Sequence, residues 1–78
     1  MVSRPIQTMP DDVATVLAEE CVRGDYDARP AYQRNDYLSW IARAKTDVTR
    51  ERRIAQMVEE LRTGGVYMGM VHAPSRKQ

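Results

Sequence analysis

The side chains that could carry out covalent or acid–base chemistry are few in this sequence. Its single cysteine, Cys21, and its single histidine, His72, lie far apart in the chain. A Cys/His nucleophile pair needs both groups within hydrogen-bond reach and a third group to orient the base. Cys21 lies on an apolar helical stripe, so we expect it to be a buried structural thiol, and we expect His72 to be solvated. The sequence therefore predicts no catalytic nucleophile.

Acidic residues occur in pairs at residues 11–12, 19–20 and 59–60. Adjacent helix positions point about 100° apart, so the two carboxylates of a pair do not face one substrate. We expect these acids to be solvated or to complement helix dipoles. One cysteine and one histidine give no metal-ligand spacing, and no glycine-rich phosphate loop follows a strand. We therefore expect no enzymatic activity, no cofactor site and no metal site.

The unusual feature of the sequence is a basic segment. Residues 43–53 hold five Arg and Lys against two acids, a local excess of three positive charges in a chain of net charge +1. Arg52 and Arg53 have no acid three or four positions away on their own helix. Arg50 lies four residues before Ile54, so it extends the apolar stripe and points toward the packed side. Arg52 and Arg53 therefore need partners from outside their own helix, whereas Arg50 has Asp47 one turn before it.

Three hypotheses explain this segment. The first is that Arg50 and Arg53 tie two helices together at their corner, a role that suits a bidentate guanidinium. Their partners would be Asp36, Asp25 or Asp27. The second is an anion site at a helix N-terminus, although an acid already occupies that terminus. The third is a nucleic-acid surface, which usually accompanies a basic excess over the whole domain. The candidate residues for a partner or anion are Lys45, Thr49, Arg50, Arg52 and Arg53.

The composition indicates one small, thinly cored domain. Leu, Ile, Val and Phe number 14 of 78 residues, but the low net charge favours folding over disorder. Stability should be marginal, so we expect help from a protein partner or from a second copy in a homodimer. No secretory pattern and no apolar run of membrane-spanning length occurs, and the single cysteine suits a reducing compartment. We therefore expect a cytoplasmic protein with no membrane span.

Apolar residues recur at helical spacing in three segments, which predicts helices over residues 10–22, 31–45 and 47–63. Thr8 is expected to cap the first helix and Thr46 the third. Between the first two helices a proline leaves room for a single helical turn. The connection of one to three residues before the third helix forces a sharp corner, antiparallel or steeply crossed. The predicted fold class is all-α, a small bundle of three main helices with room for one extra short helix.

The ends of the chain are expected to lie outside the bundle. Residues 1–8 should be a flexible lead-in to a helical domain at residues 9–65. Residues 66–78 are glycine-rich at their start, and an unpaired strand there would be poorly held, so we expect a disordered tail. The alternative is a short segment that docks on the helices or on a partner. Trp40 should be the large core residue of a domain without phenylalanine, with an exposed recognition anchor as the alternative.

One stretch of this chain resembles a known family signature. Residues 40–54 follow the pattern W-I-x-x-A-K-x-x-x-T-R-x-x-R-I of the bacteriocin-protection, YdeI or OmpD-associated (OmdA-like) family. Residues 9–13 are similar to the P-x-D opening of that family's first helix, and the resemblance covers about residues 9–63. The matching positions are Trp40, Ile41, Ala44, Lys45, Thr49, Arg50, Arg53 and Ile54.

The resemblance implies a small all-helical bacterial domain for which no enzymatic reaction is established. It also implies a link to bacteriocin or antimicrobial-peptide protection and envelope stress. The leading expectation is therefore a non-enzymatic protein-interaction domain with an unknown protein partner. The alternative is an anion or nucleic-acid binding module that uses the basic helix corner. Trp40, Ile41, Ala44 and Ile54 are expected to be structural positions of the signature.

Overall fold

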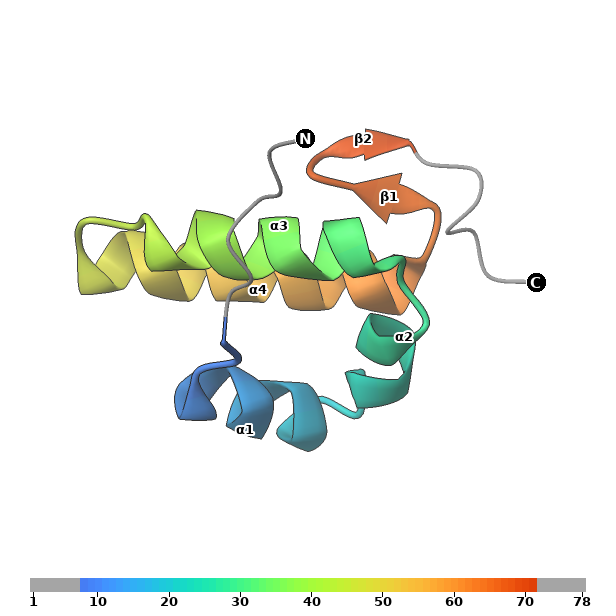
Figure 1. The fold of residues 1–78 in the computed structure, drawn as a ribbon, viewed down its shortest axis with the longest axis horizontal. Helices are drawn as coiled ribbons and strands as arrows, with labels where there is room; N and C mark the ends of the chain where they lie inside the picture. Colours follow the sequence, from blue (N-terminus) through green and yellow to red (C-terminus); the bar gives the residue numbers. More distant parts are fainter. Residues whose placement is uncertain (1–7, 72–78) are drawn as a thin grey trace, which may run out of the picture.

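The computed structural model describes residues 8–71 and contains four helices followed by a short β-hairpin (Figure 1). The elements are α1 (Asp11–Glu19), α2 (Arg23–Asp27), α3 (Ala31–Ala42), α4 (Asp47–Thr63), β1 (Val66–Tyr67) and β2 (Met70–Val71). The predicted all-α class is confirmed, with three main helices and one short one. α3 and α4 lie side by side, with α1 and α2 below this pair and the hairpin above it in Figure 1.

Helix α1 is shorter than predicted because the chain turns sharply at Cys21. This residue has a left-handed backbone, with φ of 59°. Its N–H donates to the carbonyl of Ala18 at 3.1 Å, and the N–H of Val22 donates to the carbonyl of Leu17 at 3.0 Å. These two hydrogen bonds form the Schellman motif that ends many helices. The turn leaves Cys21 exposed, so the prediction of a buried thiol is wrong.

The predicted threonine caps of α1 and α4 have different outcomes. The N-cap of α1 is Pro10, which makes no side-chain cap, so the predicted capping role of Thr8 is wrong. At α4 the prediction holds, because the Thr46 hydroxyl oxygen accepts a hydrogen bond from the N–H of Thr49 at 3.1 Å. This cap fixes the start of α4 at the predicted residue.

The connection between α3 and α4 occupies residues 43–46, so α3 ends at Ala42 and not at Lys45 as predicted. Thr46 must be extended to cap α4, and its φ of −130° and ψ of 157° show that geometry. The chain therefore leaves helical geometry before Thr46. The two helices then run in opposite directions, one of the two arrangements that the short connection allows (Figure 1).

The core collects the apolar faces of all four helices. Tyr37 on α3 is its largest fully buried side chain. Trp40, expected to fill that role, is only partly buried and packs at the margin of the core. Among the described helices, none combines the length and the apolar character needed to cross a bilayer. The buried apolar residues are Val13, Leu17, Val22, Tyr26, Tyr37, Leu38, Ile41, Ile54, Met57, Val58 and Leu61.

Residues 66–71 form an ordered β-hairpin, so the predicted disorder is wrong for this part of the tail. The two strands pair antiparallel, which supplies the partner strand that the sequence prediction lacked. The alternative prediction, a short segment docked on the helices, describes this part correctly. Residues 1–7 and 72–78, including His72, lie outside the described residues.

A two-residue turn closes the hairpin. Met68 and Gly69 have φ of 52° and 81°, as a type I′ turn requires at its two central positions. Methionine adopts this conformation rarely, whereas glycine does so freely. The strand register pairs Val66 with Val71 and Tyr67 with Met70.

The buried carboxylate of Glu60 holds this turn against α4. Its Oε1 accepts hydrogen bonds from the Tyr37 hydroxyl at 2.5 Å and the N–H of Met68 at 2.8 Å. Its Oε2 accepts from the N–H of Gly69 at 2.7 Å and from Nε2 of Gln56 at 3.0 Å. Only 6% of Glu60 is exposed, so the prediction of a solvated acid is wrong here. Four donors compensate for its burial and position the hairpin.

Candidate functional site

The residues predicted to bind a partner or an anion gather at the corner between α3 and α4, but in different environments. Lys45 and Arg52 are exposed, whereas Thr49, Arg50 and Arg53 are half-buried. Thr49 belongs to the cap of α4, where its hydroxyl oxygen also accepts a hydrogen bond from the hydroxyl of Thr46 at 3.0 Å. Part of the predicted site therefore serves the helix itself.

Arg50 ties α4 to α1 through Asp12. Its Nη2 and Nε donate to the two carboxylate oxygens of Asp12 at 3.0 and 3.2 Å. Its Nη1 also lies 3.5 Å from the carbonyl oxygen of Ile41, at the end of α3. The hydrogen bond from Arg50 is the main reason that the pKa of Asp12 is lowered. The link is bidentate, as the first hypothesis expected, but it joins α4 to α1 and does not cross the corner between α3 and α4.

The acidic partners named for this link were nevertheless wrong. Asp36 accepts a hydrogen bond from the Tyr67 hydroxyl at 2.6 Å, and Asp27 pairs with Arg23 at 3.1 Å within α2. No periodicity or spacing in the sequence indicates that the first turn of α1 lies beside Arg50. The pairing depends on the packing of the helices.

Arg53 binds the backbone and the ring of Trp40. Its Nη1 donates to the carbonyl oxygen of Trp40 at 2.6 Å. Its guanidinium carbon lies 5.3 Å from the centroid of the indole ring, a cation–π distance. Arg53 therefore joins α4 to α3, and two signature residues form one contact.

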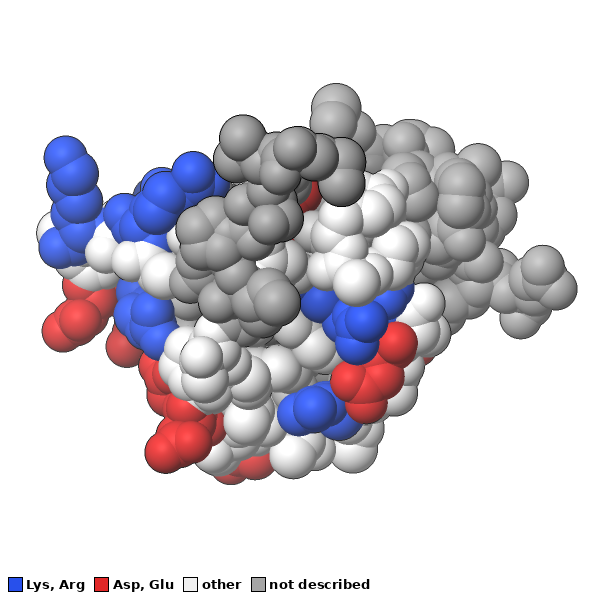
Figure 2. Space-filling model, in the orientation of Figure 1, with Lys and Arg blue, Asp and Glu red and all other residues white. Residues whose placement is uncertain are grey.

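The remaining cations of the corner are free within residues 8–71. The side chains of Arg43, Lys45 and Arg52 are exposed and make no ion pair or hydrogen bond there. Figure 2 shows basic side chains over the end of the molecule where α3 meets α4. Three cations, rather than five, remain available at this corner for an outside anion.

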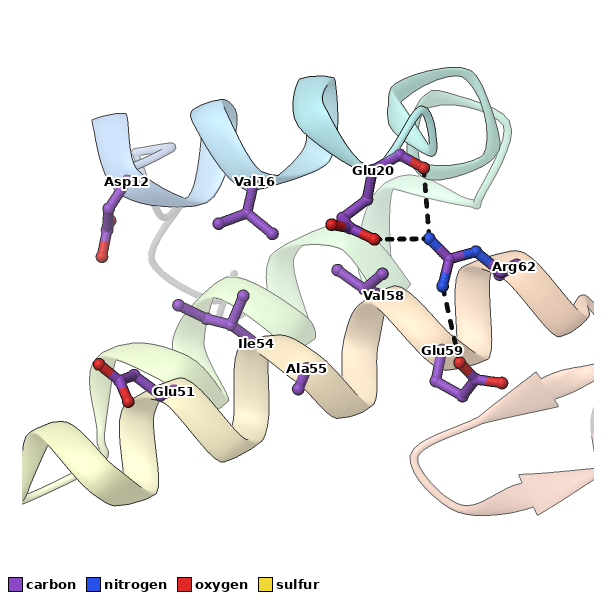
Figure 3. Close-up of a pocket in the computed structure, with 9 residues that line it drawn as sticks. All are labelled: Asp12, Val16, Glu20, Glu51, Ile54, Ala55, Val58, Glu59 and Arg62. Carbon is purple, nitrogen blue, oxygen red and sulfur yellow. Dashed lines mark hydrogen bonds and ion pairs between the residues drawn. The ribbon is translucent and has the colours of Figure 1, made fainter.

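A second surface feature, which the sequence did not reveal, is a groove of about 580 Å³ between α1 and α4 (Figure 3). Its apolar lining consists of Val16 from α1 and of Ile54, Ala55 and Val58 from α4. Ala55 is exposed and Val16 is half-buried, so part of this lining faces solvent. We call this feature the α1–α4 groove.

Acidic side chains surround the apolar lining of the α1–α4 groove. They are Asp12 from α1, Glu20 at the C-cap of α1, and Glu51 and Glu59 from α4 (Figure 3). Among the described residues that line it, Arg62 is the one basic residue. We call these four acids the acidic rim.

Salt bridges neutralise the acidic rim only in part. Arg62 donates to the carboxylate of Glu20 at 2.7 Å and lies 3.8 Å from that of Glu59. Asp12 is paired with Arg50, whereas Glu51 makes no ion pair or hydrogen bond within the described residues. Counting residues 8–71, four carboxylates thus face the guanidinium groups of Arg50 and Arg62, and the rim carries an excess of negative charge.

The residues that line this groove have a regular spacing in the sequence, but only the fold shows that the two sets lie beside each other. Asp12, Val16 and Glu20 are spaced by four residues, and so are Glu51, Ala55 and Glu59. This spacing places each set on one face of its helix. That the two faces border the same space follows from the packing of α1 on α4. For metal chemistry, no cluster of three or more suitable side chains occurs in residues 8–71.

The fold and these surfaces define a small all-α domain that carries a basic corner and an acid-rimmed apolar groove. A family model described as bacteriocin-protection, YdeI or OmpD-associated matches residues 7–64. This match covers most of the chain, so the protein belongs to that family, as the signature in residues 40–54 predicted. No curated protein and no solved structure matches the chain.

Proposed function

We propose that this OmdA-family domain contributes to bacteriocin protection by binding a protein partner in the α1–α4 groove, and that it is not an enzyme. The observation that carries the proposal is the groove itself, with its apolar lining and its ring of charged side chains. A buried apolar centre inside a polar rim is the usual anatomy of a protein interface.

The small core supports a binding role. A domain of this length has little apolar burial to spare, yet Val16 and Ala55 are left partly open to solvent in the groove. A partner that covers them removes apolar surface from water and stabilises both the complex and the fold. This is the stabilisation by a partner that the composition predicts.

Blocking the groove tests this function. In Ala55→Arg a long charged side chain fills the middle of the α4 wall, where an exposed helix position accepts it without loss of fold. Ala18→Arg is the matched control, because Ala18 is an exposed alanine of α1 outside the groove. We expect a host strain that lacks its own copy to survive bacteriocin when it carries Ala18→Arg, but not Ala55→Arg. Equal protection by both variants would contradict the proposal.

The exposed side chains of Arg43, Lys45 and Arg52 favour a second candidate function, the binding of an anion or nucleic acid at the basic corner. Phosphate-backbone binding weakens steeply as salt increases. Fluorescence polarisation with labelled duplex DNA would show affinity at low salt that Lys45→Ala/Arg52→Ala reduces. Absence of affinity at low salt would remove this candidate.

A cytoplasmic location remains a prediction from the sequence. Its basis is the single cysteine, which suits a reducing compartment. Cell fractionation of the native host tests it directly, and recovery in the periplasmic fraction would contradict it.

A further inference from the structure

The two walls of the α1–α4 groove repeat the same pattern. The α1 wall reads Asp12, Val16, Glu20, and the α4 wall reads Glu51, Ala55, Glu59, each with an apolar residue between two acids. Eight residues of helix extend about 12 Å, so each wall matches roughly two turns of a helical partner. The groove is thus short, apolar in its middle and acidic at both ends.

The groove also has room for a partner's side chain. Ala55 stands in the middle of the α4 wall and contributes only a methyl group. Ile54 and Val58 form the floor between Ala55 and α1 (Figure 3), and both are almost fully buried. A large apolar side chain from outside can therefore rest against this floor beside Ala55 without displacing a bulky residue.

The negative charge of the acidic rim favours a partner segment that is positively charged. Glu51 has no partner within the described residues, and Glu59 makes only the 3.8 Å contact with Arg62. Both carboxylates stand on the α4 wall, next to the apolar floor (Figure 3). A lysine or arginine that flanks an apolar anchor would meet them, whereas an acidic segment would be repelled.

We propose that the partner inserts a cationic amphipathic helix into the α1–α4 groove, an inference that rests on the proposed function. Apolar residues on one face of that helix would pack on Ile54, Ala55 and Val58, as in other helix-in-groove complexes. Lysine or arginine residues beside that face would pair with Glu51 and Glu59. The segment belongs to a partner protein.

A second copy of this chain is a poorer occupant. A twofold symmetric contact through the same groove would place the acidic rim of one copy against that of the other. Like charges brought together at an interface oppose association. Nucleic acid is opposed by the same excess of negative charge.

The test uses a fluorescein-labelled synthetic helix of about four turns, with leucine on one face and lysine beside it, titrated with the full chain. The variant Glu51→Lys is compared with Glu19→Lys, which makes the same change of net charge at an exposed acid outside the groove. We expect Glu51→Lys to weaken binding about fivefold, since it replaces one exposed attraction by a repulsion. Glu19→Lys should stay within about twofold of wild type.

Several results would overturn the proposal. They are equal weakening by the two variants, binding that is as strong when glutamate replaces lysine in the probe, and no binding of the lysine probe at all. A dimer in sedimentation experiments that Ala55→Arg dissociates would instead assign the groove to a second copy. Circular dichroism of each variant verifies that it is folded.

The outcomes also separate this inference from the proposed function. If Ala55→Arg abolishes protection while wild type does not bind the lysine probe, the groove binds a partner of different chemistry, and only the inference fails. If wild type binds the probe as described while Ala55→Arg still protects, the groove recognises cationic helices but does not provide protection. In that case the proposed function fails.

Discussion

Two neighbouring residues of α4, Glu59 and Glu60, have the same side chain and opposite environments. Glu60 faces the β-hairpin, is buried and accepts hydrogen bonds from four donors. Glu59 lies at the edge of the α1–α4 groove, has 72% of its side chain exposed and makes one long contact with Arg62. One carboxylate is fully engaged in holding the fold together, whereas the other remains available to a partner.

This difference extends to the two faces of the helix. The hairpin side of α4 is held by a buried polar network, which is strong when complete and very sensitive to the loss of one member. The α1 side is held at its edges by exposed ion pairs, such as that of Arg50 with Asp12, which contribute little each. The first side suits a structural role, and the second leaves space for binding.

The largest expected effect comes from Glu60→Gln. The amide nitrogen would replace one oxygen and face two hydrogen-bond donors, so at least one buried donor would lose its acceptor. We expect the free energy of unfolding to fall by about 3 kcal/mol. Glu59→Gln is the matched control and should change it by less than about 0.5 kcal/mol. Urea denaturation measures both, and similar values for the two variants would refute the contrast between the two faces.

Tyr37→Phe should have the next largest effect. It removes one donor to Glu60 but keeps the buried ring, so we expect a loss of about 1.5 kcal/mol. Burial, and then the hydrogen bond to Glu60, raise the pKa of Tyr37 above its usual value. Its contribution to stability is therefore complete below pH of about 10 and decreases at higher pH, as the unfolded chain ionises first. The difference in unfolding free energy between wild type and Tyr37→Phe should shrink in alkali; a constant difference would contradict this account.

Cys21→Gly should stabilise the protein. Cys21 adopts φ of 59° in the turn after α1, a conformation that glycine accepts without strain. Glycine also increases the entropy of the unfolded chain, so we expect a net gain of only about 0.5 kcal/mol. A thermal melt under reducing conditions measures it. A decrease in melting temperature would show that the exposed thiol contributes to stability in a way that the fold does not reveal.

Arg50→Ala should have the smallest effect, below about 1 kcal/mol, because its partner Asp12 is more than half exposed. The pKa of Asp12 is lowered in the folded protein, so the ion pair stabilises above the usual aspartate range and is lost as pH falls below about 4. The difference between wild type and Arg50→Ala should therefore disappear in acid. A loss of several kcal/mol at neutral pH would mean that the α1 side is held as firmly as the hairpin side.

The sequence predicts the helices better than it predicts their contacts. The apolar spacing and the Thr46 cap locate α4 correctly, because both signals are local. The Schellman turn at Cys21 was missed, since glycine is the usual signal for that conformation. The hairpin was missed because its turn depends on Glu60, a residue distant in sequence that looked like half of a solvated acid pair.

The candidate site was predicted less completely than the fold. Arg53 finds its partner on another helix, as its lack of a local acid predicts, whereas Arg52 makes no ion pair or hydrogen bond within the described residues. Asp12 was not recognised as the partner of Arg50. The α1–α4 groove requires knowledge of how two helices pack, which no spacing within either helix contains. The sequence therefore does not predict the contacts of residues whose neighbours lie on other helices or strands.

The most direct test of the central claim is to map the contact surface residue by residue. Nuclear magnetic resonance of the isotope-labelled protein, titrated with the synthetic lysine–leucine helix, reports which amides change environment. We predict the largest shifts at Val16, Ala55 and Val58, with Gly69 in the hairpin unaffected. Shifts centred on Lys45 and Arg52, or shifts spread evenly over the molecule, would contradict the claim that the α1–α4 groove is the binding site.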